Sequence, residues 1–424
     1  MTPHDAGSPV PHPDPPPAPQ PAPHSGQRVA RTSRPVRALR RTLVVLGAVV
    51  VTVAVVMVVP SYLPGLPIWG DFTTFGTPLA GPILLAAVAG SALCLVAGYL
   101  GVRRTGTAFA IAGLLAAAGN IGVLTVQTRQ ASDAGAQINV AQTLLAHSSS
   151  SGVPDQTVTY TTDDGTPLMM DVYLPSRPSG STEAAPVVMY THGGGWSAGD
   201  KSDHSTYLRF MADHGYLGLA PNYTLATDQR ATWDSAGPQV LCAYAWVSEH
   251  AADLGGDPNR FFVWGESAGG ALALTTTYQV ASGQGQSSCG GTPASARAVV
   301  ADVPALDPVS IYNSDDLALG GVAKNMIITY LGETPDEVPD RAAAVASASY
   351  ISASAPPTLV TTSQMDHLIP TAGAEDFIDL AQGAGVDVRT VRRDFADHGA
   401  SLSGVWAQGF PQLLLQHFQK HDVR

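Results

Sequence analysis

The run Phe-Phe-Val-Trp-Gly-Glu-Ser-Ala-Gly-Gly at residues 261–270 decides how the rest of the chain is interpreted. Residues 261–264 are apolar and predict a short buried strand, and residues 271–274 favour the start of a helix. The Gly-x-Ser-x-Gly pattern between them is typical of a sharp strand-to-helix turn, where small neighbours let the flanking backbones approach closely around a strained serine. Because this turn places Ser267 at a helix N-terminus, whose free N–H groups stabilise negative charge, Ser267 is a candidate nucleophile.

The segments on either side of this run alternate between strand and helix patterns. Expected strands cover residues 157–161, 168–174, 187–191, 217–220, 298–303, 358–362 and 386–391. One expected helix is capped by Ser202 or Asp203 and ends at His214. Others cover 233–253, 373–382 and much of 405–421, the last interrupted by Pro411. The alternation predicts an α/β fold, a mostly parallel twisted sheet with helices on both faces. Asp-Asp-Gly at 163–165 predicts a hairpin between the first two strands, which would form the antiparallel edge.

The first motif that would assist a nucleophilic Ser267 is His-Gly-Gly-Gly-Trp at residues 192–196, directly after an apolar strand. A serine that attacks a carbonyl carbon generates negative charge on oxygen, and backbone N–H groups are the usual stabilisers of that charge. Glycines let these amides face a substrate with no side chain in the way. The helix-start amide of Ala268 would complete such an oxyanion hole, so this loop is predicted to lie beside the serine.

Two further residues follow predicted strands and complete a candidate triad. Asp366 lies in the loop after the strand at 358–362, and His398 follows the last strand. His398 is the candidate base that would take the serine proton, and Asp366 would fix its tautomer and stabilise the imidazolium. The chain order Ser267, Asp366, His398 is the one expected on this sheet topology. Asp397 is an alternative acid, but the adjacent residue rarely reaches the far ring nitrogen of a histidine.

Other titratable residues near these motifs have simpler interpretations. His192 is expected to order its own loop through hydrogen bonds, and Glu266 to interact with the dipole of the helix that follows. His367 has no assigned role. Three histidines on helical patterns are expected to be surface or packing residues: His204, His214 and His250. No spacing of His, Cys and acidic residues resembles a metal site and no Gly-rich loop resembles a nucleotide cradle, so we predict no metal and no cofactor.

Residues from about 157 to 419 resemble the α/β-hydrolase fold and, within it, the hormone-sensitive-lipase-like esterases and their carboxylesterase relatives. The matching runs are Asp-Val-Tyr-Leu-Pro at 171–175, His-Gly-Gly-Gly-Trp at 192–196, Asn-Tyr at 222–223, Asp-Pro-Asn-Arg at 257–260, Gly-Glu-Ser-Ala-Gly-Gly at 265–270, Pro-Pro-Thr at 356–358, Asp-His-Leu-Ile-Pro at 366–370 and His-Gly at 398–399. The resemblance implies ester hydrolysis by six residues: Ser267, Asp366 and His398 as the triad, with Gly194, Gly195 and Ala268 as the oxyanion hole.

The sequence also departs from this family in three places. Residues 362–364 lack the glycine that usually stands before the triad acid, and Thr224 replaces an arginine that relatives often carry. The N-terminal cap of the family is not evident, and an apolar segment stands in its place. Residues 305–346, between two core strands, are expected to form a lid above the active site that determines acyl-chain selectivity.

Only 13% of the 424 residues are charged, and the apolar excess of the chain is localised in the first 130 residues. Residues 1–41 form a predicted disordered, Pro-rich tail that ends in a basic run of six arginines. Three apolar runs follow, at about 42–60, 78–102 and 107–126, each long enough to cross a bilayer as a helix. A cleaved signal peptide is the alternative for the first run, but no Ala-x-Ala site follows it and two more spans do.

The arginines predict how these spans are oriented. The basic run before the first span and Arg103-Arg104 between the second and third should stay cytoplasmic, because the loop at 61–77 carries no Lys or Arg. Three crossings then leave residues 128–154, a predicted linker, and residues 155–424, the predicted catalytic domain, on the extracytoplasmic side. Asn120 inside the third span is expected to make an interhelical hydrogen bond. The net charge of −12 offers nucleic acid no broad basic surface, so no nucleic-acid partner is expected.

The three cysteines leave one question open. Cys94 lies in the second span and is expected to be a packing residue. In an extracytoplasmic domain Cys242 and Cys289 could form a disulfide, and the alternative is a buried helical Cys242 with an exposed, free Cys289.

These observations together predict a multi-pass cell-membrane protein, a membrane-anchored serine esterase that acts on small-molecule or lipid esters through an acyl-enzyme. A peptidase or an acyltransferase on the same fold is the alternative enzyme. The alternative without enzymatic activity is a binding module on the cell surface. A transport role for the membrane part is disfavoured, because its three spans contain no buried charge.

Overall fold

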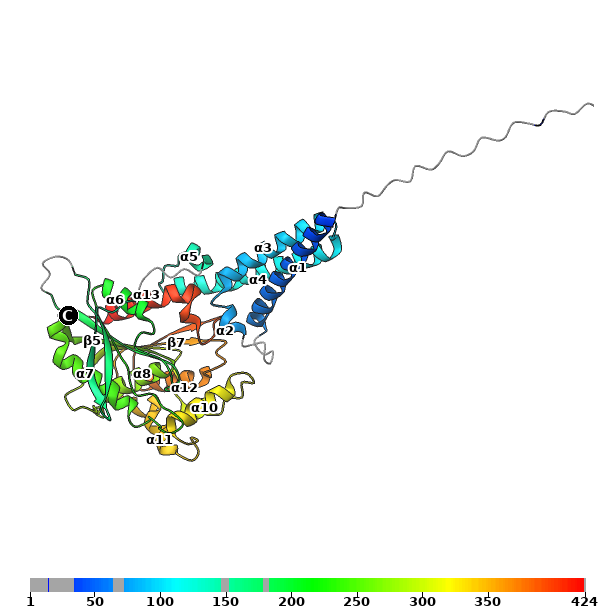
Figure 1. Cartoon of the computed structure of the whole chain (residues 1–424). Coiled ribbons are helices and arrows are strands. Elements are labelled where there is room, and N and C mark those ends of the chain that lie inside the picture. Colours follow the sequence, from blue (N-terminus) through cyan, green and yellow to red (C-terminus); the bar gives the residue numbers. More distant parts are fainter. Residues whose placement is uncertain (1–13, 15–33, 64–71, 146–151, 178–182, 423–424) are drawn as a thin grey trace, which may run out of the picture.

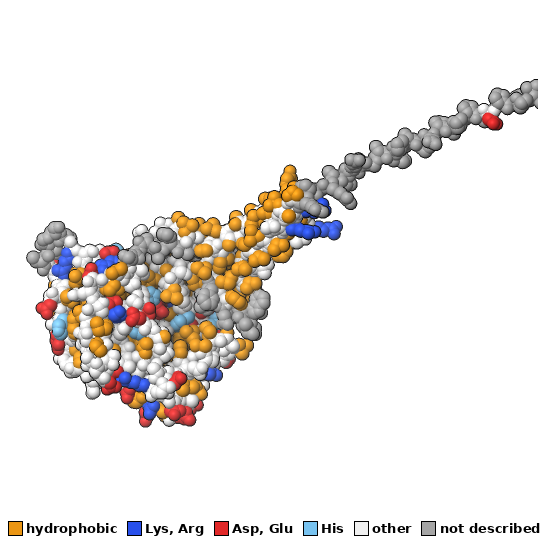
Figure 2. Space-filling view, viewed as in Figure 1, with side chains coloured by type: hydrophobic (Ala, Val, Ile, Leu, Met, Phe, Trp, Pro, Cys, Tyr) orange, Lys and Arg blue, Asp and Glu red, His pale blue; other side chains and the backbone are white. Residues whose placement is uncertain are grey.

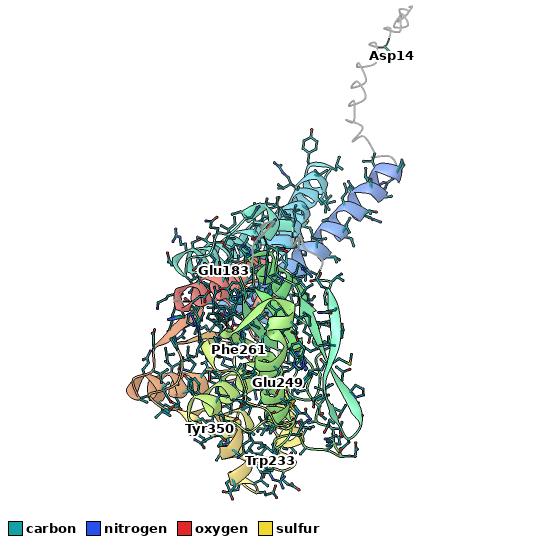
Figure 3. All side chains as sticks on the ribbon, turned by 90° about the vertical axis from the view of Figure 1, so that its left-hand side faces the viewer. Asp14, Glu183, Trp233, Glu249, Phe261 and Tyr350 are labelled. Carbon is teal, nitrogen blue, oxygen red and sulfur yellow. A yellow bond between two sulfur atoms is a disulfide. The ribbon has the colours of Figure 1, made fainter. Side chains whose placement is uncertain are left out.

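The computed structural model describes residues 14, 34–63, 72–145, 152–177 and 183–422. A bundle of three long helices rises from one side of an α/β domain, as the two perpendicular views show (Figures 1 and 3). Most of the predicted tail at 1–41 lies outside the described residues. The end of its basic run does not belong to a tail, because the first helix already begins at Arg34.

The helical bundle contains three long helices where the sequence predicts three apolar helices. Its elements are α1 (Arg34–Val58), η1 (Val59–Tyr62), α2 (Phe72–Gly76), α3 (Ala80–Tyr99) and α4 (Arg103–Asp133). The helices α1, α3 and α4 are long and apolar enough to cross a membrane. Their outward side chains are largely apolar, and basic side chains gather at the end far from the α/β domain (Figure 2).

Small residues bring the three helices of the bundle close together. A Cβ on Gly47 of α1 would lie 2.6 Å from the sulfur of Cys94 and 2.9 Å from the carbonyl oxygen of Gly90, both on α3. A Cβ on Gly106 of α4 would overlap the α3 backbone. Close approach between small residues is the usual source of helix association in lipid. Asn120 is buried, but its amide donates to the carbonyl oxygen of Ala116 on its own helix, not to a neighbouring helix.

The structure corrects the boundary of the predicted linker at 128–154. The third long helix does not stop near residue 126 but runs on to Asp133, and a short helix, α5 (Val140–Leu145), then packs against α3. The last turns of α4 stay helical because they pack on the α/β domain. Ala131 is fully buried there, in an apolar cluster with Trp406 and Leu413.

The α/β domain contains one sheet of eight strands. They are β1 (Gln156–Asp163), β2 (Thr166–Tyr173), β3 (Ala185–Thr191), β4 (Leu217–Pro221), β5 (Gly256–Glu266), β6 (Ala296–Asp302), β7 (Thr358–Ser363) and β8 (Val388–Arg393). Their order is β1-β2-β4-β3-β5-β6-β7-β8. The hairpin β1–β2 is antiparallel, β2 is antiparallel to β4, and the remaining pairs are parallel. The predicted mostly parallel sheet with an antiparallel edge is confirmed.

Helices cover both faces of this sheet. One face carries α6 (Ser205–Asp213) and α13 (Gly404–His421), and the other carries α7 (Ala236–His250), α8 (Ser267–Ala281) and α12 (Thr371–Gly383). Short elements complete the domain: η2 (Ala251–Leu254), α9 (Pro308–Tyr312), α10 (Gly320–Leu331), α11 (Pro339–Val345), η3 (Ser347–Tyr350) and η4 (Ala400–Leu402). Phe261 at the centre of β5 is fully buried and is labelled in Figure 3.

Two predictions about helices are wrong, one about where a helix begins and one about an interruption inside a helix. The helix expected to be capped by Ser202 or Asp203 has His204 as its N-cap and begins at Ser205, because His204 has a left-handed backbone with φ +51° that no α-helix accommodates. The final helix is not interrupted at Pro411. It continues through this residue because Phe410 and Leu414 on either side are fully buried against the sheet, which offsets the missing backbone bond.

Candidate active site

Ser267 sits at the sharp junction between β5 and α8, where β5 ends at Glu266 and α8 begins at the next residue. Its backbone has φ +54°, a strained value for a residue with a side chain. The glycines of the motif are required by space: a Cβ on Gly265 would overlap the carbonyl of Gly269, and a Cβ on Gly269 would overlap the carbonyl of Thr191. The local sequence therefore folds into this turn because larger residues at these positions would collide with backbone.

The structure brings Ser267, His398 and Asp366 together from three loops at the carboxyl ends of strands. The Ser267 hydroxyl oxygen lies 2.9 Å from Nε2 of His398, and Nδ1 of His398 lies 2.8 Å from Oδ2 of Asp366. The other carboxylate oxygen of Asp366 accepts the N–H groups of Leu368 at 3.0 Å and Ile369 at 2.8 Å. One oxygen of Asp366 is thus fixed by its own loop, and the other is directed at the imidazole.

The electrostatic environment of His398 favours its protonated form. Burial alone lowers the pKa of this histidine, but the charge and hydrogen bond of Asp366, helped by the charges of Glu266 and Asp397, raise the pKa to about 9. The side chain of Asp366 is only 2% exposed, so solvent screens its attraction for the imidazolium weakly. An imidazole in this site is well prepared to accept and hold a proton.

The glycine loop at 193–195 borders the serine. A Cβ on Gly193 would lie 3.3 Å from the Cβ of Ser267, and the backbones of Gly194 and Gly195 have φ of +99° and +59°, which favour glycine. His192 has the ordering role expected of it. Its Nδ1 lies 2.9 Å from the Gly193 carbonyl oxygen, and its ring stacks on Tyr223 with the ring centroids 4.3 Å apart.

Helix α10, within the segment expected to form a lid, lies against this glycine loop. A Cβ on Gly195 would come within 2.5 Å of the sulfur of Met326 on α10. The rings of Trp196 and Tyr330 stack with centroids 4.2 Å apart and an interplanar angle of 6°. The thioether of Met326 therefore forms part of the wall next to the glycine amides.

A half-buried ion pair behind the serine was not predicted from the sequence. Nε2 of His204 hydrogen-bonds the carboxylate of Glu266, and the two side chains are 7% and 19% exposed. Burial raises the pKa of Glu266, but the charge of His204 and its hydrogen bond outweigh this effect and hold the pKa below its usual value. The expectation that His204 is a surface or packing residue and that Glu266 serves the helix dipole was incomplete, since no local pattern links residues 62 apart.

The carboxylate of Asp397, the alternative acid, accepts hydrogen bonds from two peptide N–H groups and from one hydroxyl. Its Oδ1 accepts the N–H of His398 at 2.6 Å and the N–H of His367 at 3.3 Å, and its Oδ2 accepts the hydroxyl of Thr73 at 2.6 Å. His367 points elsewhere, with Nδ1 2.7 Å from Oδ2 of Asp316. Of the two candidate acids, Asp366 is the one that the fold brings to the ring.

Cys242 and Cys289 form a disulfide, with their Cα atoms 5.5 Å apart, and Cys94 is a buried free thiol in α3. The question that the sequence left open is thus answered in favour of the bond. Within the part of the chain that the structure describes, no group of three or more His, Cys, Asp or Glu side chains could hold a metal ion.

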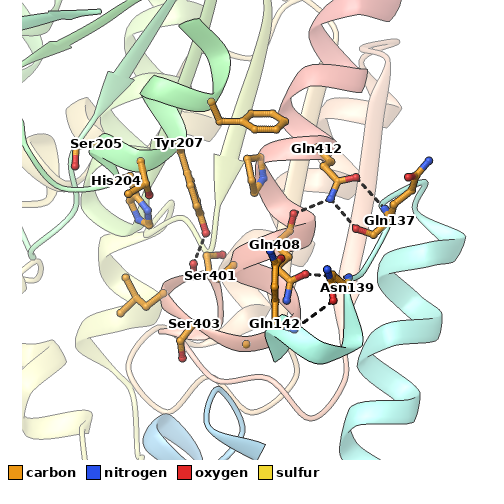
Figure 4. Close-up of a pocket in the computed structure, with 16 residues that line it drawn as sticks. Gln137, Asn139, Gln142, His204, Ser205, Tyr207, Ser401, Ser403, Gln408 and Gln412 are labelled. Atoms are coloured by element: carbon orange, nitrogen blue, oxygen red, sulfur yellow. Dashed lines mark hydrogen bonds between the residues drawn. The ribbon is translucent and has the colours of Figure 1, made fainter. Parts of the chain in front are cut away.

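A cavity of about 560 Å³ lies between the segment after α4 and the helices α6 and α13 (Figure 4). Side-chain amides and hydroxyls line much of it, and Gln412 bonds both backbone groups of Gln137 across one wall, with N···O distances of 2.9 Å. His204 reaches this cavity, but the triad residues do not line it. The cavity belongs to the junction between bundle and domain, not to the site around Ser267.

Comparison with known proteins agrees with this architecture. Residues 170–380 match the family model BD-FAE, a range that contains the serine and the acid of the site. The chain contains a BD-FAE domain with the α/β-hydrolase fold. The solved structure titled Thermogutta terrifontis esterase 2 phosphonylated by sarin has the same fold, with 21% identity, a TM-score of 0.52, and coverage of 62% of this chain and 91% of that one.

Curated relatives of the BD-FAE domain are esterases. An ethyl acetate hydrolase of Pseudomonas putida is 31% identical over 38% of this chain and 49% of its own length. The probable carboxylic ester hydrolase LipM of Mycobacterium tuberculosis is 27% identical over 53% of this chain and 51% of its own length. Carboxylesterase NlhH of the same organism is 35% identical over 28% of this chain and 36% of its own length. The chain thus spans about half or less of these relatives.

Proposed function

We propose that this chain is a membrane-anchored serine esterase that hydrolyses carboxylic esters through an acyl-enzyme. The observation that carries the proposal is the continuous hydrogen-bonded series from the Ser267 hydroxyl through His398 to Asp366, with distances of 2.9 Å and 2.8 Å. Nucleophile, base and orienting acid at these distances form the arrangement that acyl transfer requires. The esterase names of the relatives agree with this reaction class.

Each residue has a defined part in acylation. The oxygen of Ser267 attacks the carbonyl carbon while Nε2 of His398 takes its proton, and Asp366 stabilises the imidazolium through Nδ1. The charge that develops on the carbonyl oxygen is stabilised by the N–H groups of Gly194, Gly195 and Ala268. When the tetrahedral intermediate collapses, the bond to the alcohol oxygen breaks and His398 donates the proton to that oxygen. The alcohol leaves and an acyl-Ser267 ester remains.

Deacylation repeats these steps with water as the nucleophile. His398 takes a proton from water, the resulting hydroxide oxygen bonds to the acyl carbon, and the same amides stabilise the oxyanion. Collapse of the second intermediate breaks the bond to the Ser267 oxygen, which regains its proton from His398. No step needs an external oxidant, metal or nucleotide.

The membrane position of the enzyme is part of the proposal. The guanidinium of Arg40 on α1 lies beside Gly101, in the turn before Arg103 and Arg104. The arginines of α1 and those at the start of α4 therefore lie at the same end of the bundle, far from the α/β domain. By the positive-inside rule this end is cytoplasmic, and the α/β domain is then extracytoplasmic. The disulfide between Cys242 and Cys289 agrees with an oxidising compartment.

Replacing the nucleophile tests the proposal. The Ser267→Ala variant should lose about 10⁶-fold in kcat toward p-nitrophenyl acetate, because no other group replaces the attacking oxygen. A fluorophosphonate probe should label the wild-type protein at Ser267 and leave this variant unlabelled. The control variant Ser349→Ala removes an exposed hydroxyl that bonds only locally, to the carbonyl oxygen of Ala343, and should behave as wild type.

The same experiment separates the alternatives. A binding module without catalysis would show neither turnover nor labelling, and full turnover by Ser267→Ala would refute the assignment of the nucleophile. A peptidase would cleave aminoacyl amides, and an acyltransferase would transfer the acyl group to an added alcohol in preference to water.

A further inference from the structure

The loop that carries His398, residues 394–399 between β8 and η4, is bonded to the membrane bundle through α4. The amide of Gln127 donates to the carbonyl oxygen of Phe395 at 2.6 Å, and the backbone N–H of Asp394 donates to Oε1 of Gln130 at 3.0 Å. Gln127 is only 3% exposed, so its bond forms out of contact with water. Two consecutive residues of the histidine loop thus have their backbone positions set by one helix of the bundle.

A second contact comes from α2, the short helix between α1 and α3. The hydroxyl of Thr73 on α2 donates to Oδ2 of Asp397 at 2.6 Å, and both side chains are fully buried. The other oxygen of Asp397 accepts the peptide N–H of His398 and that of His367, which lies in the loop of the triad acid. Through one carboxylate, α2 is therefore joined to the loops that carry both the base and the acid.

The backbone of the histidine loop needs such support. Phe395 has φ +51°, an unfavourable value for an aromatic residue that persists only where the surroundings hold it. Its ring packs on Tyr62 of η1 with ring centroids 5.1 Å apart, and Ala396 is fully buried in the apolar cluster that α4 shares with α13. The bundle contacts the loop on the strained residue and on both of its neighbours.

Several other polar side chains of the bundle bond only within the bundle, and Tyr62 of η1 donates to the carbonyl oxygen of Gly119 on α4 at 2.6 Å. Ser91, Asn120 and Thr125 each donate to the carbonyl four residues earlier, at 2.7 to 2.9 Å. Gln127 and Thr73 instead have their bonds directed at the histidine loop. Simple anchoring in a bilayer needs no buried polar contacts with an active-site loop.

We propose that the membrane bundle is a positioning element of the active site, in which Thr73, Gln127 and Gln130 hold the loop that places Nε2 of His398 against Ser267. The inference rests on the proposed esterase function and adds to it a dependence of catalysis on the bundle. The three residues act through His398 and touch no substrate. Their loss therefore reduces turnover and leaves substrate binding in place.

The test uses the full chain in detergent micelles. Thr73→Val removes the hydroxyl with little change of shape, and the double variant Gln127→Met/Gln130→Met removes both amide contacts. Each should lower kcat about 10- to 100-fold, the effect of a displacement near 1 Å of a catalytic group, with KM changed about twofold at most. Thr73→Ser keeps the hydroxyl and should restore kcat to within about twofold of wild type.

Two control variants separate this role from general weakening of the interface. Gln412→Met breaks the two bonds to Gln137 that join the same two parts of the molecule away from the histidine loop (Figure 4). Thr125→Val removes a hydroxyl that bonds within α4. Both should keep the kcat of wild type, and melting temperatures of all variants show that each is folded.

The outcomes are distinct. If Thr73→Val and the glutamine double variant keep full kcat while wild type is active, or if Gln412→Met lowers kcat as much as they do, the positioning role is refuted and the esterase stands. If Thr73→Val lowers kcat and Thr73→Ser does not, the role is supported. A wild-type protein that neither hydrolyses esters nor labels at Ser267 would refute the esterase and the positioning role together.

Discussion

Removing the disulfide between Cys242 and Cys289 should destabilise the α/β domain without changing its packing. Cys242 is fully buried on α7, whereas Cys289 is exposed in the loop before β6. The variant Cys289→Ser therefore deletes the cross-link and leaves the buried thiol of Cys242 in place. The closed segment includes β5 and α8, so the bond restricts the part of the unfolded chain that forms the strand and helix around Ser267.

The expected effect follows from the sequence separation of 47 residues between the two cysteines. In the chain-entropy model a loop of this length lowers the entropy of the unfolded chain by about 13.6 cal/mol/K, which corresponds to about 4 kcal/mol at 25 °C. Unfolding of the α/β domain, about 270 residues at about 2.1 cal/mol/K each, has an entropy of about 0.57 kcal/mol/K. Dividing the free energy of about 4 kcal/mol by this unfolding entropy of about 0.57 kcal/mol/K gives a loss of about 7 °C in melting temperature.

Tryptophan fluorescence of the full chain during heating measures this loss. The experiment compares four samples, namely wild type and Cys289→Ser, each with and without dithiothreitol. Reductant should lower the melting temperature of wild type to that of the variant and should not change the variant further. A reduced wild-type protein, verified by mass spectrometry, that melts within about 2 °C of the oxidised one would refute the loop-entropy reasoning.

Three further outcomes follow from the charges around the site. Since His398 must be neutral to accept a proton and its pKa is raised to about 9, kcat/KM for p-nitrophenyl acetate should rise with pH until about 9, and a midpoint near 6.5 would contradict this. Glu266→Gln removes one of the charges that raise this pKa, so the midpoint of the same profile should move to lower pH. Arg393→Met leaves the carboxylate of Asp302, which is 1% exposed, without its cation at 2.8 Å, so thermal melts should show a loss of about 3–5 kcal/mol in the stability of the domain. The control Arg392→Met lies on the exposed side of β8 and should change this stability by less than about 1 kcal/mol.

The parts of this molecule that sequence predicts well are those that a local pattern determines. The turn around Ser267 follows from glycines that leave room for backbone, and the parallel sheet follows from alternating strand and helix patterns. Three apolar runs predict three long helices because length and composition suffice for that inference. The approach of Asp366 and His398 to the serine was expected from chain order on this topology, and the geometry agrees with it.

The parts that the sequence does not predict depend on contacts between distant segments. His204 and Glu266 pair across 62 residues, and no pattern near His204 distinguishes a buried partner from a packing residue. The pairing of Thr73 with Asp397 spans 324 residues. The third apolar run was expected to end at residue 126, where the sequence becomes polar with Gln127 and Gln130. The helix continues through both residues, whose side chains bond the histidine loop of the α/β domain.

The histidine loop is held by contacts from two parts of the molecule, and this explains why a strained backbone is stable there. On the inner side, Arg393 and Ser401 flank the loop and both bond the buried carboxylate of Asp302 on β6, with distances of 2.8 Å and 2.6 Å. On the outer side the bundle bonds residues 394, 395 and 397 through α2 and α4. The inner contacts come from the sheet and from η4. The outer ones come from α2 and from the end of α4, which packs on α13, so the helical bundle and the histidine loop form one interface.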